Sequence, residues 1–159
     1  MDLEHTFEEI ITQYKGVVYK ACYIYADNKE DVNDLFQEVL INIWKGLPKF
    51  REQSSISTWV YRVSINTCIS FIRKNKKRPS MVAFPINLFV PEEGSDIERQ
   101  ISELYSVINR LGQLEKALIW LWLEERDYDE IAEITGLSKS NVGVKLMRIK
   151  DKIKSMFNE

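Results

Sequence analysis

The chain has 159 residues, enough for one ordinary domain or two small helical ones. Hydrophobic residues make up 45% of it and charged residues 29%, which argues against wholesale disorder. The longest wholly apolar run, residues 117–123, is far too short to cross a bilayer. The acidic start, residues 1–4, lacks the basic residues that open an export signal.

The sulfur and imidazole ligands of the chain are few. Cys22, Cys68 and His5 cannot close a protein-only zinc site, which needs about four ligands, so no metal and no cofactor is expected. Two buried thiols in a reducing compartment are the simpler interpretation of the cysteines. A disulfide between them remains open at the level of sequence.

The net charge of −2 hides an uneven distribution. Residues 51–80 contain seven lysines and arginines and one acid, residues 81–130 eleven acids and four bases, and residues 131–159 six bases and three acids. Ordinary solvated helix faces would explain this charge pattern as well as a binding function would. Phosphate binding, however, needs local basic clusters rather than a basic whole, so the two basic segments are candidates.

Helical periodicity runs through the first half of the chain. Apolar residues between Phe7 and Ala21 recur at helical spacing, and Asp27-Asn28 breaks this first helix. A second helix is predicted over residues 29–45, ending at Gly46-Leu47-Pro48. After a loop over residues 48–55, a serine cap starts a third helix over about 57–76.

An apolar, proline-containing linker is predicted between two domains. Residues 79–94 contain three prolines and no helical period, but 81–84 and 88–90 are apolar, so we expect the linker to pack against something. Ser95-x-x-Glu98 is a capping-box pattern that opens the second domain. The fold class is therefore all-α: two small helical domains, 1–78 and 95–159, joined by a linker over 79–94.

The sharpest motif is a helix-turn-helix in the last third. Residues 128–134 form a short helix capped by Asp127, residues 135–137 form a tight turn in which Gly136 can adopt positive φ, and Ser138 begins a helix over 139–157. An ordinary helical hairpin is the alternative. The side chains expected to face outward are polar and basic, which suits the DNA major groove. They are Lys139, Ser140, Asn141, Lys145, Arg148 and Lys150.

Three segments in this order resemble the extracytoplasmic-function sigma factors of bacterial RNA polymerase. They are residues 31–44, which contain Asp34-Leu-Phe-Gln-Glu38, residues 49–66, which contain Ser54-Ser-Ile-Ser-Thr-Trp59, and the helix-turn-helix from Tyr128 to Ser138. The resemblance covers nearly the whole chain. It implies a factor that binds core RNA polymerase, recognises the −10 and −35 promoter elements and initiates transcription of a specific set of genes.

The resemblance also implies residue roles. It places a polymerase-docking surface on the second helix, at Asp34, Gln37, Glu38 and Ile41. A merely solvated helix face is the alternative. The following loop would capture a base flipped out of the promoter, whose unstacking takes a few kcal/mol. The loop residues are Phe50, Arg51, Glu52, Gln53, Ser54 and Ser55.

The third helix would continue the DNA-binding surface. Arg62, Asn66 and Arg73 share one side of it, followed by Lys74. Trp59 fits a base-stacking wedge or the hydrophobic core, and the core is favoured. The helix-turn-helix would read the upstream element, but many relatives carry a basic residue and a serine where this chain has Gly143 and Val144.

The partners implied are core RNA polymerase, promoter DNA and an anti-sigma factor, with no small-molecule substrate. The place of action implied is the cytoplasm, with polymerase at the nucleoid, and an anti-sigma partner could hold the protein at the membrane. A stand-alone helix-turn-helix regulator is the alternative function. An enzyme is not expected, because no histidine, glycine-rich phosphate loop or activated nucleophile accompanies the surface carboxylates.

Overall fold

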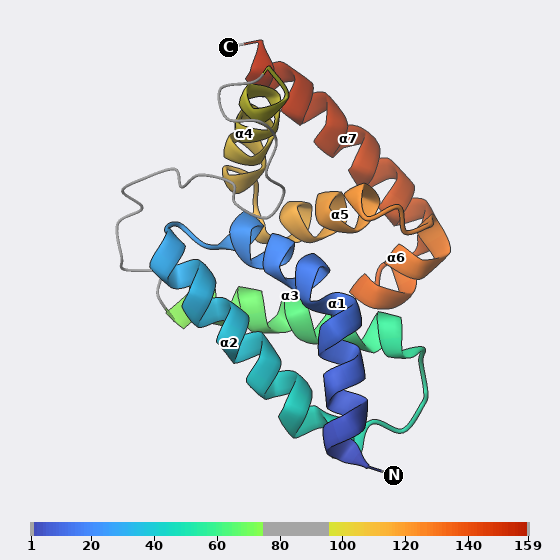
Figure 1. Ribbon diagram of the computed structural model, residues 1–159. Helices are drawn as coiled ribbons and strands as arrows, with labels where there is room; N and C mark the ends of the chain where they lie inside the picture. Colours follow the sequence, from blue (N-terminus) through green and yellow to red (C-terminus); the bar gives the residue numbers. More distant parts are fainter. Residues whose placement is uncertain (1, 75–95, 159) are drawn as a thin grey trace. The chain divides into compact units, whose positions relative to one another are not determined.

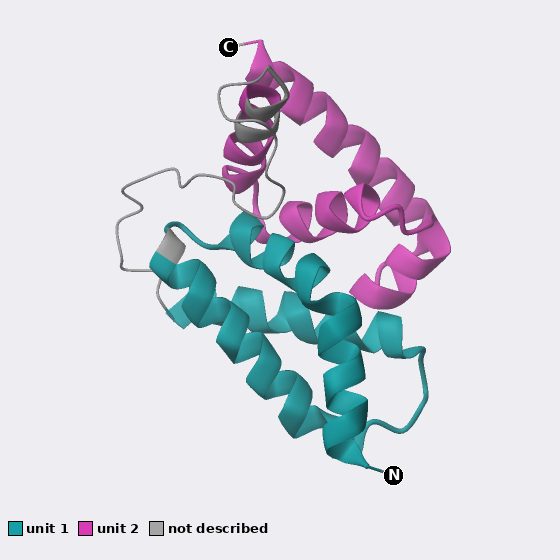
Figure 2. Ribbon diagram, in the orientation of Figure 1, with its two compact units in different colours: residues 1–81 teal, residues 82–159 magenta. Residues whose placement is uncertain are grey.

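The computed structural model describes residues 2–74 and 96–158, and the regular structure in both stretches is helical (Figure 1). This confirms the all-α prediction. The chain divides into two compact units, residues 1–81 and 82–159 (Figure 2), each of which is described by itself. The predicted linker over 79–94, its expected packing and the basic residues 76–78 lie outside the described residues.

The first unit is a bundle of three long helices. They are α1 (Leu3–Tyr25), α2 (Lys29–Gly46) and α3 (Ile56–Lys74), and the 3-10 helix η1 (Leu47–Lys49) follows α2 directly. Each long helix packs on the other two. Their facing sides supply the core, whose most deeply buried members include Val18, Ala21, Cys22, Val32, Leu35, Val39, Ile43, Val60 and Cys68.

Local signals set where these helices begin and end. Asn28 caps α2: its Oδ1 accepts a hydrogen bond from the Asp31 N–H (2.8 Å), and its Nδ2 donates to Asp31 Oδ2 (3.1 Å). The predicted break at Asp27-Asn28 is therefore confirmed. Ser55 caps α3 as predicted, because its Oγ accepts from the Thr58 N–H at 3.1 Å. The last residues predicted for the third helix, 75 and 76, lie outside the described residues.

The two cysteines are buried free thiols, as favoured from the sequence. Cys68 lies close enough to Tyr25 to affect its titration. Burial chiefly, and the charge of Cys68 secondarily, raises the pKa of the Tyr25 phenol well above its usual value. Both groups belong to the core of the first unit.

The second unit has four helices: α4 (Asp96–Asn109), α5 (Gln113–Leu123), α6 (Tyr128–Thr135) and α7 (Lys139–Phe157). The long helix α7 packs against the other three. The sequence did not separate α4 from α5. The capping-box prediction at Ser95 and Glu98 lies outside the residues and side chains that are described. The centre of this unit is formed by Ile108, Leu118, Trp120, Leu121, Ile131, Val142 and Leu146.

No helix within residues 2–74 and 96–158 is long and apolar enough to span a membrane. The same stretches contain no group of three or more histidine, cysteine, aspartate or glutamate side chains placed to hold a metal ion.

Candidate nucleic-acid interface

The outer side of α2 presents the predicted polymerase-docking residues together. Asp34, Gln37 and Glu38 are exposed, and Ile41 is 45% exposed, on the side opposite the buried Val39. No hydrogen bond or ion pair joins the three polar side chains to other parts of the chain that the structure describes. We name this surface, residues 34, 37, 38 and 41, the α2 face.

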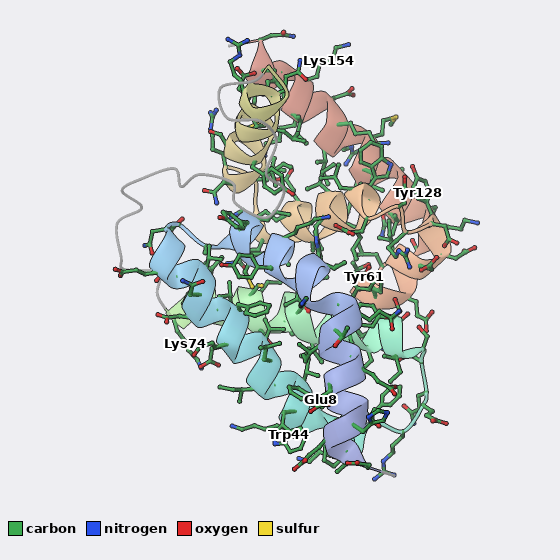
Figure 3. The ribbon with its side chains drawn as sticks, viewed as in Figure 1. Glu8, Trp44, Tyr61, Lys74, Tyr128 and Lys154 are labelled. Atoms are coloured by element: carbon green, nitrogen blue, oxygen red, sulfur yellow. The ribbon has the colours of Figure 1, made fainter. Side chains whose placement is uncertain are left out.

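Sequence reasoning missed a neighbour of the α2 face. Trp44, labelled in Figure 3, is 42% exposed, and its ring meets Phe7 of α1 edge-on with 5.2 Å between ring centroids. It follows Ile41 by three residues and therefore lies on the same side of the helix. That three-residue spacing is the sequence signal that could have identified Trp44 as part of this side of α2.

The loop between η1 and α3 forms the wall of a small cavity of about 200 Å³. Phe50 and Trp59 pack together there, with ring centroids 5.2 Å apart. Glu52, at the turn of the loop, has a left-handed backbone with φ of 57°. The cavity gathers most of the predicted base-capture residues and one more lysine. Its lining consists of Lys49, Phe50, Arg51, Gln53, Ser54, Trp59 and Arg62.

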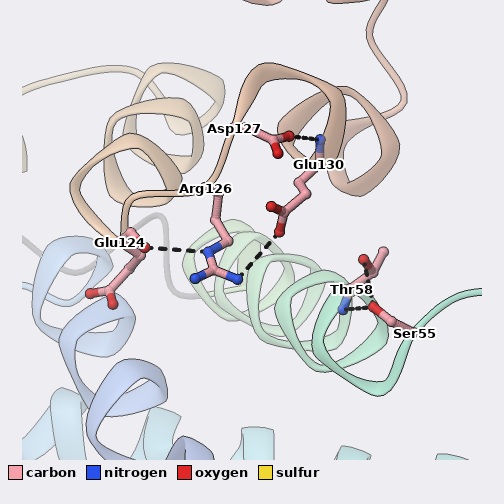
Figure 4. A network of polar contacts seen from close by, with 6 residues as sticks. All are labelled: Ser55, Thr58, Glu124, Arg126, Asp127 and Glu130. Atoms are coloured by element: carbon pink, nitrogen blue, oxygen red, sulfur yellow. Dashed lines mark hydrogen bonds and ion pairs between the residues drawn. The ribbon is translucent and has the colours of Figure 1, made fainter.

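Trp59 is half-buried and belongs to this wall. Its indole also lies against Gly46, at the end of α2. Ser55 has a local role, since its hydroxyl accepts from the Thr58 N–H and donates to Thr58 Oγ1 at 3.1 Å (Figure 4). Trp59 therefore both packs against the loop and lines the cavity.

A second, larger hollow of about 810 Å³ runs between α2 and α3. Among the predicted residues it includes Asn66 and Lys74 on α3 and Glu38 of the α2 face. Lys49 lines both hollows, so the two adjoin along α3. Arg73 is exposed nearby on α3 but lines neither. Lysine ammonium groups and asparagine amides along a groove can hold a nucleic-acid backbone and base edges.

The helix-turn-helix is formed as predicted by α6, a turn and α7. Asp127 accepts from the Glu130 N–H at 2.8 Å, and Arg126 bridges the Glu124 carbonyl (3.3 Å) and the Glu130 carboxylate (3.2 Å) in Figure 4. Gly136 has the expected left-handed conformation, with φ of 81°. Ser138 caps α7 by accepting from the Asn141 N–H at 3.1 Å. The Gly136 turn and the Ser138 cap therefore define where α7 begins.

The predicted contacts on α7 divide into two groups. Ser140, Asn141 and Arg148 are exposed, as is Lys139, which forms a surface ion pair with Asp129 at 3.4 Å. Such an exposed pair is weak and leaves the lysine available to a phosphate.

Lys145 and Lys150, by contrast, are half-buried and therefore less exposed than the first group. The Lys150 ammonium lies 4.1 Å from the centre of the Trp122 ring on α5, which differs from the outward orientation expected for it. Lys152 pairs with Glu115 at 3.0 Å.

Comparisons with known proteins identify the family to which both parts of the chain are similar. Residues 10–78 match the family model described as Sigma-70 region 2, and residues 101–153 match Sigma-70, region 4. The chain is 29% identical over 139 residues to the RNA polymerase sigma factor SigV of Bacillus subtilis, covering 87% of this chain and 82% of that protein. It is 23% identical to the ECF RNA polymerase sigma factor SigM of the same organism, covering 96% of each.

A solved structure shares the fold. The sigma factor RpoE from Bartonella quintana, in complex with the anti-sigma factor NepR, superposes with a TM-score of 0.77 and 15% identity, covering 96% of this chain and 97% of that one. The two region models lie in one short chain in the order that the sequence motifs indicated, and the full-length relatives are sigma factors. The chain therefore belongs to the extracytoplasmic-function sigma factors, which bind core RNA polymerase and initiate transcription at specific promoters.

Proposed function

We propose that the α2 face docks this sigma factor on core RNA polymerase. The observation that carries the proposal is a contiguous exposed surface in which Asp34 and Glu38 precede the apolar Ile41 along one side of α2, on a helix fixed by a fully buried opposite side. Trp44 extends the apolar part of this surface. Protein interfaces commonly combine an apolar patch with charged groups at its edge, as this surface does.

The two hollows along α3 support a role in promoter opening. The smaller cavity, between Phe50 and Arg62, offers aromatic walls and arginines to a flipped base and its phosphate. The larger one, with Asn66 and Lys74, would hold the displaced strand next to it. The −10 element is therefore read on the first unit.

On the second unit, the exposed side of α7 reads the −35 element in the major groove. Ser140 and Asn141 lie in its first turn, where a recognition helix contacts base edges, and Lys139 and Arg148 are placed for phosphates. The protein works by binding and positioning rather than by catalysis, in the cytoplasm where polymerase and DNA are.

An anti-sigma factor is the remaining partner we propose. The solved relative RpoE is bound to the anti-sigma factor NepR. The exposed apolar side chains Ile41 and Trp44 of this chain would be open to such an inhibitor. An inhibitor that covered them would also prevent docking on polymerase.

Co-elution with the cognate core polymerase tests the docking surface. Asp34→Arg reverses one charge of the α2 face and is expected to abolish stable co-elution of a protein that still folds. Glu8→Arg is the matched control, because Glu8 is exposed on α1 rather than α2 (Figure 3). Retained binding by Asp34→Arg, or equal loss in both variants, would contradict the assignment of the α2 face.

A further inference from the structure

Two large apolar side chains lie on the exposed side of the proposed recognition helix α7. Val144 is 41% and Met147 is 59% exposed, the latter being the highest exposed fraction of any large hydrophobic side chain among the described residues. Neither contributes to the core of the second unit. An exposed apolar pair on a helix that otherwise carries polar and basic groups needs a physical explanation.

The spacing places the pair within the expected DNA-reading side. Val144 and Met147 follow Ser140 by four and seven residues, so the three side chains share one side of α7. Val142, Leu146 and Ile149, which are at most 2% exposed, occupy the opposite side and anchor the helix. The positions of Val144 and Met147 are therefore fixed by the core of the unit rather than by local contacts.

We propose that Val144 and Met147 read thymine 5-methyl groups in the −35 element. The proposal rests on the proposed role of α7 as the recognition helix. In the major groove the thymine methyl is the apolar group on the base edges, and apolar side chains are its natural partners. The short, stiff Val144 would fix one contact close to the helix axis, whereas the flexible Met147 reaches further.

DNA fits this surface better than a protein does, because the apolar pair is set among groups that suit phosphates and base edges. Arg148 adjoins Met147 and is exposed, and Lys139 and Asn141 precede the pair in the first turn. The pair is thus continuous with the surface already proposed to contact the duplex. We therefore expect this factor to prefer an upstream element that contains thymine opposite Val144 and Met147.

Replacement of thymine by deoxyuracil tests the proposed methyl contacts directly, since it removes only the 5-methyl group of the base. Holoenzyme assembled with the cognate core is first used to select the upstream element from a promoter library randomised there. Each selected thymine is then replaced by deoxyuracil, and holoenzyme affinity is measured for wild type, Val144→Ser and Met147→Gln. Phe157→Ser is the matched control, because Phe157 is 43% exposed at the far end of the same helix.

We expect at least one deoxyuracil replacement to weaken wild-type binding about three- to fivefold, the effect of one buried methyl. The same replacement should have almost no effect in Val144→Ser or in Met147→Gln, and its full effect in Phe157→Ser. Thermal melting of each variant checks that the fold is intact.

Selection of a defined upstream element without sensitivity to deoxyuracil would overturn the thymine contacts and leave the recognition helix in place. Equal sensitivity in wild type and in both variants would also overturn them. If Val144→Ser lost self-association or binding to core polymerase while its deoxyuracil sensitivity stayed unchanged, the pair would be assigned to a protein partner instead. Failure of the holoenzyme to select any upstream element would overturn both the inference and the proposed function of α7.

Discussion

The indole of Trp59 lies so close to Gly46 that a Cβ atom added to the glycine would stand 2.9 Å from Trp59 Cζ2. The same indole packs on Phe50 of the proposed base-capture loop. Trp59 thus connects the end of the polymerase-docking helix α2 to the loop cavity. A side chain at Gly46 would have to displace Trp59, and with it one wall of that cavity.

Gly46→Ala is therefore expected to destabilise the first unit by about 1–3 kcal/mol, the range found for overpacked sites. The Gly46 backbone is in the right-handed helical region, so the contact with Trp59 rather than the backbone causes the loss. Chemical denaturation measures the change. Trp59→Phe combined with Gly46→Ala should recover part of it, because the smaller ring leaves room for the methyl group.

Gly16→Ala is the matched control, since nothing lies within 4 Å of the position where its Cβ would stand. Gly16 is inside α1, where alanine stabilises a helix by up to about 1 kcal/mol relative to glycine. The two glycine substitutions should therefore have opposite signs. Stabilisation by both would show that Trp59 moves aside without a penalty.

The salt dependence of promoter binding should separate the two classes of basic residue on α7. Arg148 is exposed, and Arg148→Ala is expected to reduce the slope of log affinity against log salt by about 0.9, the value for one lost phosphate contact. Lys150 lies over Trp122, so Lys150→Ala should change the slope much less. The measurement is a holoenzyme titration between low and moderate salt. An equal change in both variants would mean that Lys150 leaves Trp122 on DNA binding.

The stability of the second unit should depend on the ionisation of Glu115. Its Oε1 accepts from the Gly112 N–H at 2.9 Å and pairs with Lys152 Nζ at 3.0 Å. Burial by itself would raise the pKa of Glu115, but the Gly112 hydrogen bond and the nearby Lys152 and Lys145 lower it overall. A lowered pKa means that the folded state favours the carboxylate.

The stabilisation by Glu115 is therefore fully present above the usual glutamate value of 4.5 and is lost as the pH falls through the lowered value of the folded protein. Glu115→Gln should melt at a lower temperature than wild type at neutral pH, and the difference should shrink below about pH 4.5. Melting curves across this range measure it. Glu103→Gln, an exposed change on α4, should show no such convergence. A difference that does not vary with pH would exclude the carboxylate as its source.

The elements that could be predicted from the sequence are those with local signals. Asn28, Asp127 and Ser138 cap their helices with their own side chains, and Gly136 supplies the left-handed turn. Each of these interactions joins residues at most three positions apart, so neighbouring residues in the sequence are enough to predict it. The outward position of the α2 face was predictable for the same reason, because one helix period determines it.

Features that depend on distant partners could not be predicted. Residues 117–121 of α5 are all apolar and all buried, so they show no polar side that would reveal a helical period. The boundary between α4 and α5 therefore could not be predicted from the sequence. Lys150 was expected to face outward because helical spacing cannot show that Trp122, from another helix, lies beneath it. Nor could spacing show that Trp59 adjoins Gly46. In each case tertiary packing decided the position of the side chain.

Gly143 gives the last prediction, and it concerns a departure from the family noted in the sequence. Gly143 lies in the middle of α7, where glycine weakens a helix by about 1 kcal/mol relative to alanine. A Cβ there would stand 3.4 Å from Cε2 of Tyr128, at the start of α6 (Figure 3), which is a close but acceptable contact. Gly143→Ala is therefore expected to stabilise the second unit by up to about 1 kcal/mol, measured by denaturant unfolding.

The sign of this change shows what the glycine does. If packing against Tyr128 tolerates the methyl group, Gly143→Ala raises stability and leaves promoter affinity unaltered, because position 143 is half-buried rather than exposed. Destabilisation that Tyr128→Leu relieves would instead show that the glycine is needed for the close approach of α6 to α7. A stabilised variant with weaker promoter binding would contradict both outcomes, since it would require Gly143 itself to approach the DNA.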